Sequence, residues 1–249
     1  MEAKFAGLTH NEEEEAILQI QPLPIPEKEE RGFCLVGCFL TASVIHFSAM
    51  KSTMANLWHS IRDVQILDLG ERRFLFQFFH IMDMERVLKG SPWTFNNHLL
   101  LLHTLQWGED PLRVYLILTP FLVQIHDVPT VFFEALAKQL GDFIGTFLEH
   151  DEANMRKGYQ NFLRVRIQLD VRYPLKRKKS VMFYENLSYV KFKYERLTLF
   201  CFYCGRLGHS DSFCEAKMAL GVEITEMGWD ISLRAQSRRA RAQSSVWLR

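Results

Sequence analysis

The fold of the C-terminal part of this chain is decided by the stretch Cys201-Phe202-Tyr203-Cys204-Gly205-Arg206-Leu207-Gly208-His209-Ser210-Asp211-Ser212-Phe213-Cys214. Its potential metal ligands are Cys201, Cys204, His209 and Cys214, at the spacing Cys-x2-Cys-x4-His-x4-Cys. Three thiolates and one imidazole are the donors that Zn²⁺ takes in a closed tetrahedral site, which leaves no ligand position for a catalytic water. The spacing therefore predicts a zinc knuckle that holds one structural Zn²⁺ ion.

Two glycines inside this stretch support the prediction. At Gly205 and Gly208 the chain must turn tightly enough for its amides to approach the thiolates, and glycine reaches such dihedral angles without a Cβ clash. Zinc contributes on the order of 10 kcal/mol of folding free energy to so short a segment, so we expect the knuckle to unfold without metal. An alternative interpretation takes Cys201 and Cys204 as a redox-active Cys-x-x-Cys pair or as two structural cysteines.

Basic residues concentrate directly before and within the predicted knuckle. The formal net charge of the whole chain is only +1, yet residues 156–206 contain thirteen Lys or Arg residues against Asp170, Glu185 and Glu195. A run of charge is usually a solvated face, but beside a zinc knuckle it is typical of a surface that binds phosphates. This part of the chain therefore favours a nucleic-acid partner.

Two predicted strands carry much of this charge. Apolar residues alternate with polar ones over residues 163–171 and again over 190–194, which is the pattern of half-buried strands. We expect residues 176–179 to form a charged turn between strands. If the two strands are neighbours, five basic side chains share one face of a sheet, namely Arg164, Arg166, Arg172, Lys191 and Lys193.

These strands belong to a second α+β unit, predicted at residues 111–197. It begins with a strand at 121–125, followed by a helix that Thr130 caps and Gly141 ends. The knuckle follows at residues 198–216, and a basic tail occupies residues 217–249.

The first ordered unit is predicted at residues 31–110 and has the element order βαββαβ. This order gives an RRM-like sandwich, an antiparallel sheet with two helices on one face. Two such units in succession could be distantly related folds, although no repeat of fixed period is visible. The predicted elements are a strand at 33–39, an amphipathic helix at 47–61, strands at 64–69 and 74–78, a helix at 83–90 that Asp83 caps, and a strand at 99–102.

Phe74, Phe76 and Phe78 alternate on one face of the third strand. They invite comparison with the aromatic strand of an RNA recognition motif, but Arg73 and Leu75 stand where that motif has glycine. We therefore favour the interpretation that the three rings face the two helices as core.

The N-terminal residues 1–30 contain eight acids against Lys4 and Lys28, and we expect a flexible acidic leader. No secretory signal is visible, and Cys34 and Cys38 are a poor disulfide framework, so we expect an intracellular protein of the nucleus or cytoplasm. Residues 33–50 lack formal charge, which raises the question of a membrane span. Polar residues interrupt this stretch, and we favour no membrane association.

The knuckle and the strand before it, residues 194–197 and 200–210, resemble a plant family. It is the transposon-associated domain of unknown function with a Cys-x2-Cys-x4-His-x4-Cys knuckle, found in gag-like first-open-reading-frame proteins of LINE-type retroelements. The chain departs from that family at two places. Cys38 stands where the family often has a basic residue, and residues 43–45 replace a more polar loop. The order of further motifs extends the resemblance over Leu35-Val36-Gly37, Trp58, Leu69-Gly70, Phe76-Gln77-Phe78, Pro92-Trp93, Val128-Pro129 and Trp247-Leu248-Arg249.

The module is also similar to retroviral-type knuckles, in which the aromatic residue after the first cysteine stacks on an unpaired base. Phe202 occupies that place here, and the alternative is that its ring packs on the preceding strand. Ser210 and Asp211 stand where such knuckles often have apolar residues. Affinity should then rest more on Arg206 and the basic strands, and it should fall steeply with salt.

No combination of residues typical of an active site is visible, so we expect a protein that is not an enzyme. The leading hypothesis is a zinc-dependent protein of retroelement origin that binds single-stranded nucleic acid, RNA in preference to DNA. The alternative is a scaffold for protein–protein interaction or self-association, in which the knuckle is purely structural. The predicted nucleic-acid contacts are Phe202, Arg206, Arg164, Arg166, Lys191 and Lys193.

Overall fold

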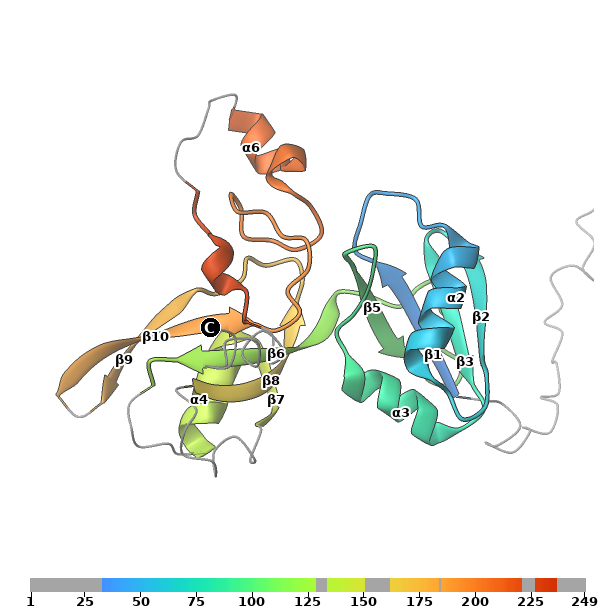
Figure 1. Cartoon of the computed structure of the whole chain (residues 1–249), viewed down its shortest axis with the longest axis horizontal. Helices are drawn as coiled ribbons and strands as arrows, with labels where there is room; N and C mark the ends of the chain where they lie inside the picture. The colour runs from blue at the N-terminus through green and yellow to red at the C-terminus, as the bar shows by residue number, and fades with distance from the viewer. Residues whose placement is uncertain (1–32, 129–133, 151–161, 184, 221–226, 237–249) are drawn as a thin grey trace, which may run out of the picture. The chain divides into compact units, whose positions relative to one another are not determined.

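The computed structural model describes residues 33–128, 134–150, 162–183, 185–220 and 227–236. The chain divides into two units, residues 1–32 and 33–249, and every described residue belongs to the second. The predicted acidic leader and most of the predicted tail therefore lie outside the described residues. The described part contains two five-stranded antiparallel sheets with helices (Figure 1), which confirms the mixed α+β class.

The first sheet has the strand order β2-β3-β1-β5-β4, with β1 in the centre. The predicted order βαββαβ is confirmed, because β1 pairs on one side with β3 and on the other with β5. The short strand β4 is additional. The elements are β1 (Phe33–Phe39), α2 (Phe47–Trp58), β2 (Val64–Gly70), β3 (Arg73–Phe78), α3 (Ile81–Gly90), β4 (Trp93–Phe95) and β5 (His98–Thr104).

Aromatic residues dominate the core between this sheet and its helices. Phe74, Phe76 and Phe78 are 4%, 0% and 0% exposed, so the interpretation of these rings as core is confirmed. The indole of Trp58, at the end of α2, packs edge-on against the Phe76 ring with 5.1 Å between centroids. The period-two pattern of β3 and the helical spacing of α2 therefore meet in one core.

The start of α3 differs from the prediction. His80, not Asp83, caps the helix, and its Nδ1 accepts a hydrogen bond from the Met82 amide at 3.1 Å. Asp83 lies in the first turn, is 1% exposed and ion-pairs with Arg86. Its carboxylate also accepts hydrogen bonds from the amides of Ile61 and Arg62, so it fixes the loop after α2 to α3.

The second sheet has the strand order β7-β8-β6-β10-β9. Element for element this is the order of the first sheet, with β6 in the place of β1 and β8 in the place of β3. The elements are β6 (Leu118–His126), α4 (Glu134–Ile144), β7 (Thr146–His150), β8 (Phe162–Asp170), β9 (Lys178–Phe183) and β10 (Asn186–Tyr194).

Several expectations for this sheet are wrong. The two basic strands, β8 and β10, are not neighbours, because β6 lies between them and pairs with both. Lys178 and Lys179 begin β9 instead of forming a turn. Gly141 lies inside α4, where a Cβ would meet the Phe147 ring at 2.7 Å, so close packing explains this glycine. The predicted cap, Thr130, lies outside the described residues.

The core of the second sheet combines α4 with segments that follow the sheet in sequence. Ala137, Leu140 and Ile144 of α4 cluster with the buried residues of β6, β8 and β10. No described helix of this sheet corresponds to α3. Leu99 and Leu101 of β5, on the first sheet, also belong to this cluster. Residues from the loop after β8 and from the region after β10 complete it, among them Leu175, Leu197, Phe200, Leu207 and Leu233. Throughout the described ranges, no helix combines the length and apolar character needed to cross a bilayer.

Candidate metal centre and nucleic-acid interface

The predicted knuckle begins with a tight backbone turn. Phe200 and Leu207 form an isolated antiparallel bridge, and the Cys201 amide donates to the Arg206 carbonyl at 2.9 Å. Gly205 and Gly208 have φ angles of +72° and +92°, in the left-handed region that favours glycine. The two glycines therefore allow the turn that returns the chain to its own cysteines.

The turn brings the four predicted metal ligands together. One donor atom each from Cys201, Cys204, His209 and Cys214 lies within 4.8 Å of every other. The Cys204 Sγ and the His209 Nε2 are 3.3 Å apart. Tetrahedral Zn²⁺ with bonds of about 2.0 to 2.3 Å separates its donors by roughly 3.3 to 3.8 Å. The donor set therefore fits Zn²⁺ if the distances between the donor atoms shorten modestly.

The environment of Cys201 shows what a cation would contribute. Cys201 is fully buried, and burial raises the pKa of its thiol to about 12. The amide of Cys204 points at its Sγ at 3.4 Å and partly offsets this effect. Because thiolates are the ligands of zinc, a bound Zn²⁺ supplies the positive charge that keeps this sulfur deprotonated at neutral pH.

A return segment, residues 227–236, fastens the metal centre to the second sheet. The Trp229 amide donates to the Phe202 carbonyl at 3.0 Å, and its indole N–H donates to the Leu175 carbonyl at 2.8 Å. The Trp229 ring lies over Gly205, where a Cβ would meet it at 2.3 Å. The Ala235 amide then donates to the Tyr194 carbonyl at the end of β10. Sequence reasoning missed this segment.

Two family models match the chain, and the second covers this centre. Residues 169–216 match the zinc knuckle family. Residues 27–113 match a family described as a domain of unknown function (DUF4283). The chain thus carries a DUF4283 domain followed by a zinc knuckle. No curated protein shows significant similarity to the sequence.

Two solved structures with some similarity contain the Sex-lethal protein. A Sxl-lethal protein/RNA complex is 13% identical, and the match covers 55% of this chain and 81% of that one. The Sex-lethal RNA recognition domains 1 and 2 from Drosophila melanogaster are 14% identical, with 55% and 86% covered. Both have a TM-score of 0.24, so our assignment of the fold rests on the strand order instead.

Phe202, predicted to stack on a base, is half-buried in the knuckle. Its ring lies 4.6 Å from that of Phe200 and packs against the core of the second sheet. Its amide donates to the carboxylate of Asp211, which ties the start of the knuckle to the residues before the last ligand. Asp211 therefore has a structural role in the place where retroviral-type knuckles have an apolar residue.

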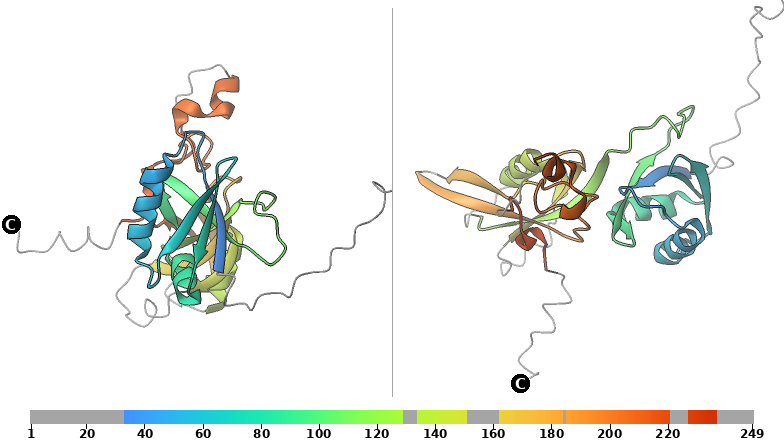
Figure 2. Two further views of the ribbon diagram at one scale, coloured as in Figure 1. Left: turned by 90° about the vertical axis from the view of Figure 1, so that its right-hand side faces the viewer. Right: turned by 90° about the horizontal axis from the view of Figure 1, so that it is seen from above.

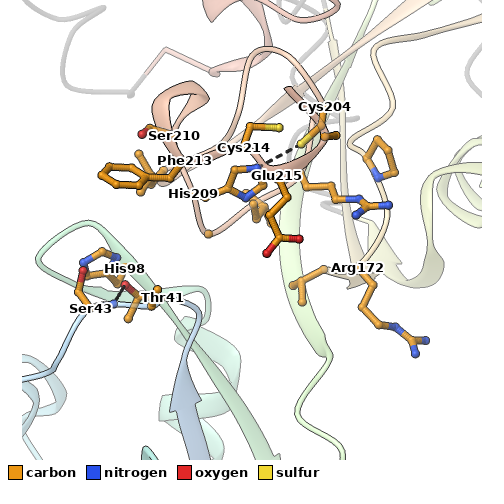
Figure 3. A pocket seen from close by; sticks show the side chains of 18 residues that line it. Thr41, Ser43, His98, Arg172, Cys204, His209, Ser210, Phe213, Cys214 and Glu215 are labelled. Atoms are coloured by element: carbon orange, nitrogen blue, oxygen red, sulfur yellow. Dashed lines mark hydrogen bonds between the residues drawn. The ribbon is translucent and has the colours of Figure 1, made fainter. Parts of the chain in front are cut away.

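The exposed aromatic residue of the knuckle is Phe213, which sequence reasoning missed. Its side chain is 74% exposed, because the short 3-10 helix η1 (Asp211–Phe213) turns it away from the core. Phe213 lines a cavity of about 950 Å³ together with Arg172, Arg206 and His209 (Figure 3). The predicted contact residue Arg206 is exposed on the same module. The knuckle thus combines an accessible ring with the exposed guanidinium group of Arg206. The guanidinium of Arg172 donates to both carboxylate oxygens of Asp170, and Glu215 lies between Phe213 and Arg172 (Figure 3).

Arg164 lies on the outer face of β8 but is engaged by an acid. Its guanidinium binds both carboxylate oxygens of Glu195, at 2.9 and 2.6 Å, and Gln124 donates to the same carboxylate at 2.8 Å. The side chains of Arg164 and Glu195 are only 18% and 19% exposed. This bidentate pair offsets the charge of Arg164 inside the protein.

Arg166, two residues further along β8, is likewise engaged. It donates to the carbonyls of Leu88 and Lys89 at 2.7 and 2.6 Å, at the end of α3. Glu149 lies 3.5 Å from its guanidinium, and the Arg166 side chain is 11% exposed. Arg166 therefore acts as a structural contact in this arrangement.

The lysines of β10 are more accessible. Lys191 pairs with Asp127 at 2.9 Å, but both side chains are more than half exposed, so water and salt compete with the pair. Lys193 is partly exposed. On the central strand β6, Gln124 pairs with Lys193 of β10 on one side and with Arg164 of β8 on the other. The predicted basic side chains of β8 and β10 therefore share one face, although β6 separates them.

Proposed function

We propose that this protein binds single-stranded nucleic acid in a zinc-dependent manner, with RNA preferred to DNA, and that it is not an enzyme. The observation that carries the proposal is the Cys₃His cluster with the exposed Phe213 ring and the exposed guanidinium group of Arg206 on the same module. A flat exposed ring accepts a base, and guanidinium groups bind the adjacent phosphates.

The role of zinc in this proposal is structural. Four protein donors complete a tetrahedral shell, so we expect one Zn²⁺ per chain with no position for a reacting water. The metal holds the turn at Gly205 and the η1 helix in the conformation that presents Phe213. Chelation should therefore abolish binding by unfolding this surface.

The proposal assigns the basic residues to two roles. Arg206, Lys191 and Lys193 contact phosphates, because their charges face solvent or are only weakly paired. Arg164 and Arg166 stabilise the second sheet, since acids and carbonyls already satisfy their guanidinium groups. Each phosphate contact adds to the salt dependence of binding, whereas the structural arginines do not.

The order of the two modules supports a retroelement origin. A domain of unknown function followed by a zinc knuckle agrees with the resemblance to gag-like proteins of plant LINE-type elements. A protein that coats its own transcript needs affinity for unpaired RNA more than sequence preference. We propose that it acts in the cytoplasm or nucleus, where such transcripts occur.

The decisive experiment combines zinc analysis with a binding titration. Full-length protein is purified with zinc and titrated into a fluorescein-labelled oligouridine at about 50 and 200 mM salt. We expect one zinc per chain, binding that weakens strongly at the higher salt, and loss of binding after chelation or in Cys204→Ser. Cys34→Ser, a free thiol outside the metal centre, is the matched control. Binding that is indifferent to both chelation and salt would refute the proposal.

One observation favours the alternative of a protein-interaction scaffold. Apolar side chains are exposed around the point where Asp83 ties the loop after α2 to α3: Ile61 is 70%, Met82 56% and Phe79 47% exposed. Such a patch is typical of a protein contact. Complex formation or self-association that is insensitive to salt and lost in Ile61→Ser would support this second function.

A further inference from the structure

The hairpin of β9 and β10 presents one outer face. In the antiparallel register, Lys178 lies opposite Lys191, Ser180 opposite Tyr189, and Met182 opposite Leu187. Residues directly opposite each other in such a ladder point to the same side of the sheet. Figures 1 and 2 show this hairpin, in orange, extending beyond the other strands of its sheet.

The other face of the hairpin continues into the core. Val190 and Phe192, which alternate with the outer residues of β10, are 0% and 2% exposed. The Phe143 ring of α4 lies 6.0 Å from that of Phe192. Since α4 covers this inner face, the outer face of the hairpin is the one that is open to a partner.

The outer face exposes an unusual amount of apolar surface for a strand pair. Met182 is 73%, Leu187 61% and Tyr189 52% exposed. Met182 lies opposite Leu187, and Tyr189 follows Leu187 by two residues on the same strand. Single exposed apolar residues are ordinary, but a contiguous group on one face indicates a binding surface. The phenol ring of Tyr189 is the aromatic member of this group.

Positive charge adjoins the Tyr189 ring on one side, away from the hairpin turn. The Lys178 ammonium lies 5.6 Å from the centre of the ring, within range of a cation–π interaction. Lys191 follows Tyr189 on the same face, and Lys193 comes two residues later. The described acids nearby are Asp127, which pairs with Lys191 in solvent, Glu185 in the hairpin turn, and Glu195. The carboxylate of Glu195 is bound by Arg164 and Gln124, so it does not neutralise the lysines of this face.

We propose that this hairpin face is a second site for single-stranded nucleic acid, at which Tyr189 stacks on a base and Lys178 and Lys193 bind the phosphates on one side of that base. The inference rests on the proposed function and adds a surface distinct from the metal centre. An open strip on which an exposed ring is followed by a row of ammonium groups suits a flexible polyanion whose bases are unpaired.

A second copy of the chain is a poorer occupant for this hairpin. β9 is the edge strand of its sheet, and edge strands pair readily with another chain unless charge opposes it. Lys178 and Lys179 both lie on β9, and charged lysines on an edge strand are a common device that opposes pairing with another chain. An anionic partner meets the same lysines with favourable charge.

The test uses the zinc-loaded full chain and a labelled oligouridine of about twelve nucleotides, long enough for one such site. Tyr189→Ala should weaken binding roughly 5- to 150-fold, which is the effect of losing one stacked base. Tyr189→Phe should bind like the unmodified protein because it keeps the ring. Tyr189→Leu should bind like Tyr189→Ala because it keeps apolar area without a flat face.

Tyr115→Ala is the matched control, since Tyr115 is 86% exposed and lies outside the hairpin. If the unmodified protein binds, Cys204→Ser fails to bind, and Tyr189→Ala is unchanged, the hairpin site is wrong while the proposed function stands. If Tyr189→Leu binds normally, apolar docking replaces stacking and the inference is overturned. A dimer in sedimentation velocity that Tyr189→Ala dissociates, without a change in oligouridine affinity, would assign the face to a second copy.

Discussion

The two sheets of this protein have the same strand order but different outer surfaces. β3 and β8 occupy equivalent places, each beside the central strand of its sheet. Their inward residues are alike in character, phenylalanines in β3 and aliphatic residues in β8. Their outward residues differ: β3 presents Arg73, Leu75 and Gln77, whereas β8 presents Arg164, Arg166 and Gln168. Strand order alone therefore does not determine how much charge the outer face of a sheet carries.

The comparison also distinguishes basic side chains that are bound within the protein from those that are free to bind a ligand. The arginines of β8 are bound by Glu195 and by backbone carbonyls, while the lysines of the β9–β10 hairpin face solvent. Both sets look equally basic in the sequence. Only the second set can exchange its present contacts for phosphates at small cost, because its ion pairs are solvated.

The two cores are completed in different ways. The first sheet is covered by α2 and α3, and Asp83 links the two helices through the loop between them. The second sheet has α4 and then depends on Phe200 and Leu207 of the knuckle and on Leu233 of the return segment. Leu99 and Leu101 of β5 also join this cluster, whereas the described core between the first sheet and its helices contains no residue of the knuckle. The stability of the second core should therefore depend on zinc much more than that of the first core.

Removing zinc should give the largest effect and should separate the two sheets. The metal contributes on the order of 10 kcal/mol to the knuckle, so chelation should unfold it and expose Phe200 and Leu207. Amide hydrogen exchange followed by mass spectrometry should then show faster exchange in β10 and unchanged protection in β1 and β3.

Acidification is a second way to remove zinc and unfold the knuckle. Protons compete with zinc for the thiolates and for the imidazole of His209, so zinc affinity falls as the pH falls below neutrality. Zinc release on acidification should precede loss of protection in the first sheet. Equal loss of protection in β1 and β10 on chelation would mean that the two cores unfold as one and that the comparison fails.

A core truncation in the first sheet should have the next largest effect. Phe76→Ala removes a fully buried ring that packs on Trp58, and we expect a loss of about 3 to 5 kcal/mol in the free energy of unfolding. Denaturant titration with hydrogen exchange as the local probe should find the loss in β1 and β3. Zinc content should stay at the level of the unmodified protein, and a protein that loses zinc would contradict the independence of the two cores.

The smallest effects should distinguish paired from available charge. Arg164→Ala leaves Glu195 without its bidentate partner in a mostly buried place, and we expect a loss of about 1 to 3 kcal/mol in stability with an unchanged salt slope of binding. Lys193→Ala should change stability by less than about 0.5 kcal/mol and should reduce the slope of log K against log salt by about 1. The reverse pattern would show that the β8 arginines are the phosphate contacts.

Much of the fold could be predicted because its determinants are local. The apolar run of β1, the alternation in β3, β8 and β10 and the helical spacing of α2 follow from neighbouring residues, and each element is found within a few positions of its prediction. The strands missed were β4, β7 and β9. They are short or lie at sheet edges, where fewer inward residues leave a hydrophobic pattern.

The sequence by itself determined the metal centre, because four donors within one short turn can reach the same ion whatever surrounds them. It also determined that positive charge lies beside this centre. Only the tertiary structure decided which charges are available, because the partner of Arg164 lies 31 residues away and becomes its neighbour only after β6 enters between β8 and β10. The same holds for the rings: burial of Phe202 and exposure of Phe213 and Tyr189 depend on packing against segments distant in sequence.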